Sequence, residues 1–209
     1  QAIDQAQSLQ PYREEVHALR AQGLACAGDF VGAMQALQPA IYPAVPAGLE
    51  LTRAQLLWDI GEQELAYAVV QKSAEQHPDS VDTWRRLERW ATLREDRLIA
   101  LQAVEHQVKL QPHDPDVLNS AAEYFATMKD NAKAVELFRR AIEISPGFAG
   151  SRCRLFDLLV EQSEWDKAEQ VIGELPRLDQ HPAVLARRLQ VALHRNDEAQ
   201  ADKELDGIL

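Results

Sequence analysis

The sequence contains little of what several protein classes require. It holds two cysteines among 209 residues, which are too few for a disulfide framework. Aromatic residues make up only 6%, and the β-branched and aromatic residues that favour strands are scattered. No apolar run approaches the roughly 18 to 20 residues that cross a bilayer, and no basic stretch followed by an apolar one indicates a signal peptide. We therefore expect neither a disulfide-rich domain nor direct membrane insertion.

Positively charged residues are fewer than negatively charged ones. The chain has 22 Lys and Arg against 33 Asp and Glu, a net charge of −11, with a pI near 5.0. This balance argues against a general nucleic-acid binder, because phosphate contacts depend on a basic surface, and against docking to anionic membranes. A basic protein or a cationic polymer would be the natural electrostatic partner. The alternative is that the acidic surface serves solubility alone.

The residues that are abundant are strong helix formers, and alanine recurs at a fixed period. A small residue is needed where the second helix of a helical hairpin presses against the first. Alanines suited to that place occur at intervals of 33, 34, 34, 34 and 33 residues. A constant period of this length is typical of stacked helical repeats. The alanines are Ala33, Ala66, Ala100, Ala134, Ala168 and Ala201.

Two further signals share this period. Five residues before each alanine stands a predicted turn, where Gly, Asn or Asp would tolerate a left-handed backbone or cap the next helix. Four residues after each alanine stands an apolar residue on the same helical face. The turns are Gly28-Asp29, Gly61-Glu62, Glu95-Asp96, Lys129-Asp130, Ser163-Glu164 and Asn196-Asp197, and the apolar residues are Leu37, Val70, Val104, Phe138, Ile172 and Leu205.

Prolines predict where the second helix of each repeat ends, because proline lacks an amide donor. Pro78, Pro112 and Pro146 each lie 12 residues beyond their alanine, and Pro46 and Pro182 lie near the equivalent places. Helix starts follow. Ser80 precedes one predicted helix, and Asp114 precedes another that has proline at its first position. The proline-rich segment 38–48 is expected to shorten the second helix of the first repeat.

This pattern resembles the tetratricopeptide repeat family. Residues 115–148 match best, with Leu118, Ala121, Ala122, Phe125, Ala134, Phe138, Ala141 and Pro146 at the family's positions. The resemblance implies an all-α fold, a right-handed superhelical solenoid of about six helix-turn-helix repeats, forming a single domain over residues 1–209. The repeats would occupy about residues 13–46, 47–80, 81–114, 115–148, 149–182 and 183–209.

The two ends of the chain carry separate expectations. Residues 1–12 would be the tail of a preceding repeat or an N-terminal cap. Leu205, Ile208 and Leu209 would present an apolar face with nothing beyond, which favours a fragment of a longer array. Cys26 and Cys153 would lie four repeats apart, at about 10 Å per repeat, and therefore cannot form a disulfide within one chain.

The sequence lacks the motifs that carry chemistry. It contains no Walker loop, GxGxxG, GxSxG or HExxH motif. Six histidines occur, but none lies four residues from another, as two metal ligands on one helix would. His77, His113 and His181 flank prolines, where we expect them to cap helix ends. We therefore expect no metal site, no cofactor and no enzymatic activity.

In a repeat stack of this kind the first helix of each repeat lines the concave side. Exposed residues of those helices are the candidate partner-binding residues, and we predict that a protein partner, either a peptide or a folded domain, binds there. They are Gln55 and Trp58 of the second repeat, Arg85, Arg86 and Arg89 of the third, Asn119 and Glu123 of the fourth, and Arg154 and Asp157 of the fifth.

The arginines stand out because the chain is otherwise acidic. Arg85 and Arg89 would lie one helical turn apart and could share one carboxylate or phosphate, since guanidinium groups bind such anions bidentately. The alternative pairs these arginines and Arg94 with Glu88, Glu95 and neighbouring acids as solvated ion pairs.

The sequence leaves several functions open. The leading one is a non-catalytic protein–protein interaction scaffold. A narrower version follows from composition, because the chain looks like periplasmic segments of bacterial exopolysaccharide export and assembly proteins. That resemblance would place the chain in the periplasm and allow it to track a cationic polymer. The alternative is a substrate-recruiting or regulatory module of a larger enzyme, such as a glycosyltransferase or methyltransferase. A third is self-association through the C-terminal repeat.

Overall fold

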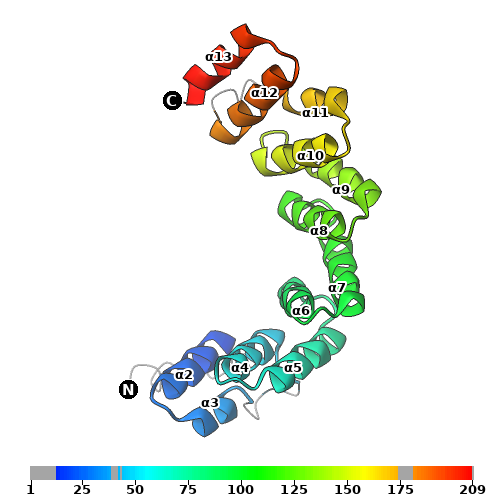
Figure 1. The fold of residues 1–209 in the computed structure, drawn as a ribbon. Helices are drawn as coiled ribbons and strands as arrows, with labels where there is room; N and C mark the ends of the chain where they lie inside the picture. Colours follow the sequence, from blue (N-terminus) through cyan, green and yellow to red (C-terminus); the bar gives the residue numbers. More distant parts are fainter. Residues whose placement is uncertain (1–12, 39–41, 43, 174–180, 209) are drawn as a thin grey trace. The chain divides into compact units, whose positions relative to one another are not determined.

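The computed structural model describes residues 13–38, 42, 44–173 and 181–208. These residues form twelve α-helices and no strand (Figure 1), so the predicted all-α fold is confirmed. The helix predicted within residues 1–12 lies outside the described residues. The chain divides into two compact units, Gln1–Leu110 and Gln111–Leu209. That all repeats form one domain stays a prediction.

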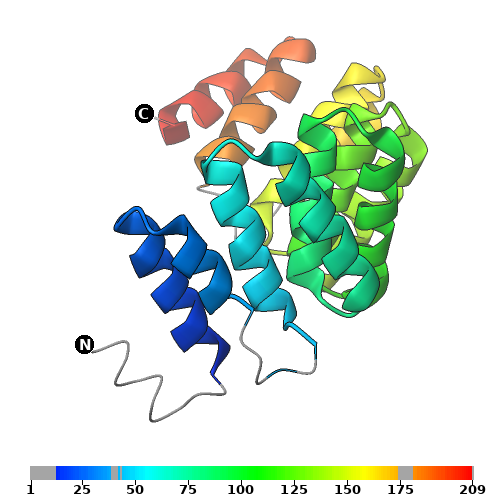
Figure 2. The ribbon, with the colours of Figure 1, turned by 90° about the horizontal axis from the view of Figure 1, so that it is seen from below.

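Unit 1 contains three helical hairpins, in which each first helix packs against the helix that follows it. The blue hairpin of α2 and α3 can be followed in both Figure 1 and Figure 2. The helices are α2 (Glu14–Cys26) with α3 (Phe30–Ala36), α4 (Ala47–Asp59) with α5 (Gln63–Gln76), and α6 (Val81–Leu93) with α7 (Arg97–Leu110).

Unit 2 contains three more hairpins of the same kind. They are α8 (Pro115–Thr127) with α9 (Asn131–Ile144), α10 (Ala149–Glu161) with α11 (Trp165–Ile172), and α12 (Pro182–His194) with α13 (Glu198–Ile208). The exact boundaries of the repeats stay a prediction.

All six predicted turns are confirmed, and they share one backbone geometry. The first residue of each turn pair has positive φ, and the amide of the second donates to the carbonyl five residues earlier. Such a bond satisfies a carbonyl that the end of the helix would leave unpaired. The positive-φ residues are Gly28, Gly61, Glu95, Lys129, Ser163 and Asn196.

The core also follows the predicted pattern. The six periodic alanines are all buried, which lets the two helices of each hairpin approach closely. Five of the six apolar residues that follow them are buried as well. Leu205 is the exception at 43% exposed. Leu205 was predicted to belong to an apolar face at the end of the chain, and no described helix packs on that face of α13.

The prolines divide into two groups. Pro78, Pro112 and Pro146 each follow the last residue of a second helix by two positions, as predicted. Pro46 and Pro182 instead begin the next first helix, Pro46 as the N-cap of α4 and Pro182 as the first residue of α12. Pro46 and Pro182 lie farther from the preceding second helix, because α3 and α11 span only 7 and 8 residues, whereas α5, α7 and α9 each span 14. The shortening predicted for the first repeat is therefore confirmed.

The two cysteines are both free. Cys26 is exposed in α2, whereas Cys153 is buried in α10 of the other unit. Burial raises the pKa of the Cys153 thiol.

Candidate partner-binding surfaces

The first helices of unit 1 bring together five predicted site residues. Gln55 and Trp58 lie on α4, and the three arginines lie on the neighbouring α6. Ser80 caps α6 by accepting a hydrogen bond from the Thr83 amide at 3.4 Å, so the helix starts where the sequence predicted. We call this surface the basic–aromatic surface. Its residues are Gln55, Trp58, Arg85, Arg86 and Arg89, and they lie beside the buried Trp90.

Trp58 of the basic–aromatic surface stacks on the buried Trp90. The Trp58 and Trp90 rings lie 4.4 Å apart and nearly parallel, at 16°. The Arg86 guanidinium lies 5.2 Å from the Trp90 ring centroid and donates a hydrogen bond to Gln55 Oε1. The Gln55 amide in turn donates to Asp59 at 2.7 Å. These contacts join α4 to α6 and fix the half-buried Arg86.

The charge of this surface is only partly compensated. Arg85 Nη1 lies 3.3 Å from Asp82, one turn away on the same helix, with both side chains largely in solvent. Arg89 is exposed and forms no ion pair with any described residue. Burial lowers the pKa of Arg86, and the neighbouring charge of Arg89 lowers it further. Arg86 and Arg89 therefore repel each other, whereas Asp59 and Asp82 raise the pKa of Arg86 and compensate part of this charge. An incoming carboxylate would relieve the repulsion that remains.

The sequence also allowed these arginines to form solvated ion pairs with neighbouring acids, and some of them do. Arg94 donates to both carboxylate oxygens of Glu64, at 2.8 and 2.7 Å, and this contact lowers the pKa of Glu64. Arg94 also stacks 4.7 Å from the Tyr67 ring. Glu88, however, accepts from Thr92 at 3.4 Å, and burial raises the pKa of its carboxyl. Arg94 is thus engaged, whereas Glu88 does not neutralise Arg89 through an ion pair.

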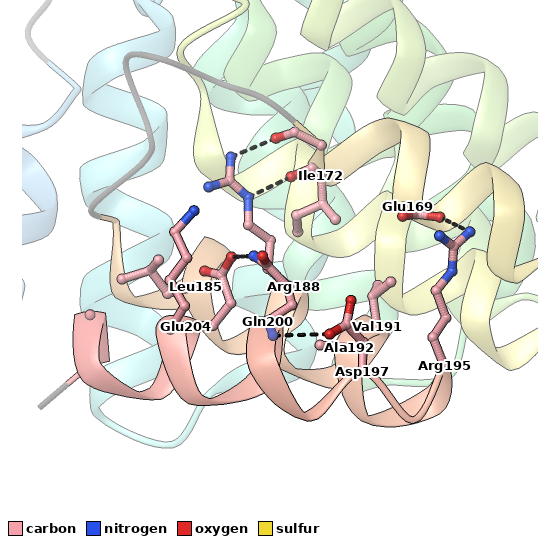
Figure 3. A pocket seen from close by; sticks show the side chains of 13 residues that line it. Glu169, Ile172, Leu185, Arg188, Val191, Ala192, Arg195, Asp197, Gln200 and Glu204 are labelled. Atoms are coloured by element: carbon pink, nitrogen blue, oxygen red, sulfur yellow. Dashed lines mark hydrogen bonds and ion pairs between the residues drawn. The ribbon is translucent and has the colours of Figure 1, made fainter.

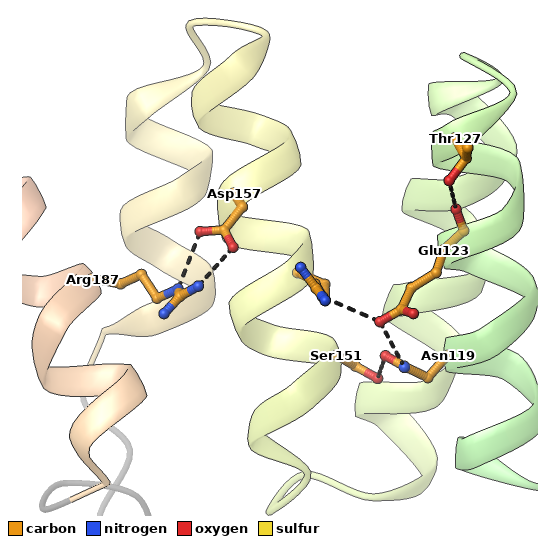
Figure 4. A network of polar contacts seen from close by, with 7 residues as sticks. Asn119, Glu123, Thr127, Ser151, Asp157 and Arg187 are labelled. Carbon is orange, nitrogen blue, oxygen red and sulfur yellow. Dashed lines mark hydrogen bonds and ion pairs between the residues drawn. The ribbon is translucent and has the colours of Figure 1, made fainter.

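The first helices of unit 2 bring together the other four predicted residues. Asn119 and Glu123 lie on α8, and Arg154 and Asp157 lie on α10. Asn119 accepts from Ser151 at 2.9 Å and donates to Glu123 at 3.3 Å, and Arg154 donates to the same Glu123 carboxylate at 3.2 Å (Figure 4). These contacts connect α8 to α10.

Arg187 on α12 extends this network, and sequence reasoning missed it. Its guanidinium donates one hydrogen bond to each carboxylate oxygen of Asp157, at 3.1 and 2.7 Å. Each carboxylate of the network, Glu123 and Asp157, thus has one arginine partner. We call this network the polar ladder, and its charge is balanced internally. It consists of Asn119, Glu123, Ser151, Arg154, Asp157 and Arg187.

A cavity of about 890 Å³ lies in unit 2 between α11, α12 and α13 (Figure 3). Arg188 crosses it to donate to the Ile172 carbonyl at 3.0 Å, and Arg195 pairs with Glu169. Glu204 is buried there beside Gln200. The cations and carboxylates of its lining are largely paired with each other or with helix ends, so the cavity shows no preference for one ligand charge.

The histidines serve as packing and capping groups. His106 stacks on Trp84 at 4.1 Å and His194 on Trp165 at 3.8 Å. His77 bonds the Val45 carbonyl at 2.9 Å, in the connection before α4 and not at a helix end. His181 does cap a helix, since it accepts from the amide of Ala183 at the start of α12. In the described part of the chain, no three His, Cys, Asp or Glu residues cluster as metal ligands, and no helix is long and apolar enough to span a membrane.

Comparison with known proteins supports the architecture. A family model described as tetratricopeptide repeat matches residues 125–193. Residues 125–193 are thus similar to tetratricopeptide repeats. The C-terminal part of a tetratricopeptide repeat-containing protein from Cytophaga hutchinsonii matches 100% of this chain and 87% of its own, at 14% identity and a TM-score of 0.71. No curated protein matches the chain.

Two further solved structures with this repeat fold are similar. PilF of Pseudomonas aeruginosa is 17% identical, covers 98% of this chain and 90% of its own, and has a TM-score of 0.62. YrrB, described as a protein of this type with an unusual peptide-binding site, is 16% identical, with 78% and 84% covered and a TM-score of 0.57. At these identities the tetratricopeptide-repeat fold alone is shown.

Proposed function

We propose that this chain is a non-catalytic interaction scaffold that holds a protein partner on the basic–aromatic surface of unit 1. The observation that carries the proposal is the group of three arginines on α6 beside the Trp58–Trp90 stack, with Arg89 unpaired among the described residues. A solved relative in fold is described as having a peptide-binding site, which supports a peptide as one form of partner.

The side chains of the basic–aromatic surface favour a partner segment that carries carboxylates. Guanidinium groups bind carboxylates bidentately, and a flat aromatic face accepts an apolar or planar side chain beside them. The polar ladder of unit 2 is a weaker candidate, because its arginines already bind Glu123 and Asp157. A partner there would have to replace existing ion pairs. The cationic polymer suggested by the net charge of −11 would need a different, acidic surface.

Charge reversal tests this proposal. With the whole chain as bait, a partner is captured and its affinity measured, and the double variant Arg85→Glu, Arg89→Glu is then compared. We expect affinity to fall by at least about 30-fold, since two charge-assisted contacts of about 1 kcal/mol or more are lost and replaced by repulsion.

The matched control reverses two other exposed charges, Lys109→Glu and Arg139→Glu, so that the net charge changes equally. This control should retain the wild-type affinity. Equal affinity of the Arg85 and Arg89 variant and the wild type would refute the site. Equal losses in both variants would show a response to net charge instead.

Narrower roles stay predictions from the sequence. They are envelope assembly or exopolysaccharide export in the periplasm, a recruiting module of a larger enzyme, and self-association of the C-terminal repeat. The sequence on either side of these residues separates the first two: a β-barrel pattern downstream favours export, and a Rossmann-like domain favours the enzyme. Light scattering that shows a monomer at high concentration would argue against self-association.

A further inference from the structure

An open groove lies in unit 1 on a different face of α4 from the basic–aromatic surface. Second helices α5 and α9 each pack against the first helix of the next repeat, whereas α3 makes no comparable contact with α4 in the described residues. With only 7 residues, α3 is half as long as α5. A groove therefore runs between α3 and α5, with α4 as its floor.

The groove consists of two adjoining hollows of about 390 and 370 Å³, which share Met34, Gln38 and Leu57. Its apolar side chains are unusually open to solvent: Val31 is 71% exposed and Leu65 is 56% exposed. Soluble proteins rarely expose a continuous apolar patch unless it is a binding site. The apolar lining comes from three helices and comprises Phe30, Val31, Met34, Leu57, Ile60, Leu65 and Val69.

The floor of the groove is one stripe of α4 at helical spacing, formed by Glu50, Arg53, Leu57 and Ile60. From residue 50 to residue 60 a helix rises about 15 Å, which equals about three turns of a second helix laid along it. A helix in a groove is a common recognition mode, in which residues at i, i+3, i+4 and i+7 face the groove. Met34 adds a flexible, polarisable surface that adapts to such a helix.

Charge distinguishes the two ends of the groove. The Leu57 and Ile60 end is apolar. At the other end Arg53 and Glu50 neutralise each other at 3.3 Å, and exposed Lys72 has no ion pair with any described residue. Among the described residues that line the groove, the one uncompensated charge is therefore positive. An acidic group on the occupant would complement it.

We propose that this groove binds an amphipathic helix of a partner protein, with its apolar stripe over Leu57 and Ile60 and a carboxylate beside Lys72. A partner is favoured over a second copy of this chain, because two chains of net charge −11 repel each other. This site is separate from the basic–aromatic surface and does not depend on it.

A displayed library of amphipathic helical peptides of about three to four turns tests the proposal without a known partner. The library is selected on the whole wild-type chain, and the enriched peptides are measured against Val31→Lys and Leu65→Lys. Both residues are largely exposed, so the variants should keep the wild-type circular dichroism. We expect each variant to weaken binding at least 10-fold. The control Leu98→Lys changes an 81% exposed leucine of α7 outside the groove and should have no effect.

Lys72→Glu tests the charge of the occupant. Peptides selected on the wild type should carry Asp or Glu at one end of the apolar stripe, and selection on the Lys72→Glu chain should favour Lys or Arg there. No enrichment of amphipathic peptides, or binding that is indifferent to Val31→Lys and Leu65→Lys, would overturn the proposal. A wild-type dimer that dissociates with Val31→Lys would also overturn it, because the occupant would then be a second copy.

Discussion

Four residues with a side chain adopt the left-handed backbone at the hairpin turns, and Lys129 is one of them, with φ of 64°. A Cβ atom disfavours this conformation by about 1 kcal/mol, whereas glycine adopts it freely. We expect Lys129→Gly to stabilise the chain by roughly 0.5–1 kcal/mol, because relief of the strain exceeds the entropy that glycine adds to the unfolded state. Urea unfolding followed by circular dichroism measures the change.

The reverse substitution is the control. Gly61 has φ of 89°, and a Cβ atom there would meet nothing within 4 Å. Gly61→Ala should therefore destabilise the chain by about 1 kcal/mol through backbone strain alone. A neutral Gly61→Ala, or a destabilising Lys129→Gly, would show that the turns do not carry this strain.

At the scale of a helix pair, the periodic alanine sets how closely the two helices approach. Ala134 is fully buried where α9 faces α8, while Ala132 on the same helix is exposed. We expect Ala134→Leu to destabilise unit 2 by about 1–3 kcal/mol, because the added carbons must push the helices apart. Ala132→Leu should change stability by less than about 0.5 kcal/mol. Denaturant titration of both variants checks the difference, and equal effects would contradict a close approach at Ala134.

The helix pairs could be predicted from the sequence because their signals are local. Glycine, proline and alanine act through the backbone or the neighbouring turn, so the turns at Gly28 and Gly61 and the helix end before Pro78 follow from residue type. Leu205 keeps the periodic position but is exposed, because burial also requires a neighbouring helix, which the local pattern does not reveal.

The surface residues were harder to predict, because their partners lie one repeat away. Trp58 stacks on Trp90, 32 residues further on, and Asp157 binds Arg187, 30 residues further on. These separations are two to four residues shorter than the 34-residue period, because a residue of one first helix contacts a position nearer the start of the next first helix than its own equivalent. A search for complementary residues 30 to 32 positions apart would have found Arg187 and shown that the polar ladder is neutral.

At the scale of the whole chain, the division after Leu110 makes a prediction about folding. Stability in repeat proteins is close to a sum of repeat and nearest-neighbour terms, so a group of adjacent repeats with its own core should fold alone. Unit 2 has such a core, with Leu118, Phe138 and Phe156 almost completely buried. We therefore expect a fragment of residues 111–209 to be helical and to unfold cooperatively by circular dichroism.

The Arg187–Asp157 pair tests whether that fragment keeps the structure it has in the whole chain. Both residues lie in unit 2, so Arg187→Ala should destabilise the fragment and unit 2 of the whole chain equally, by about 1 kcal/mol for a partly exposed bidentate pair. Lys167→Ala, which removes a more exposed partner of Glu164, is the matched control and should cost less. An unfolded fragment, or an Arg187→Ala effect confined to the whole chain, would mean that unit 2 depends on unit 1 for its structure, because nearest-neighbour contacts within unit 2 would then be insufficient.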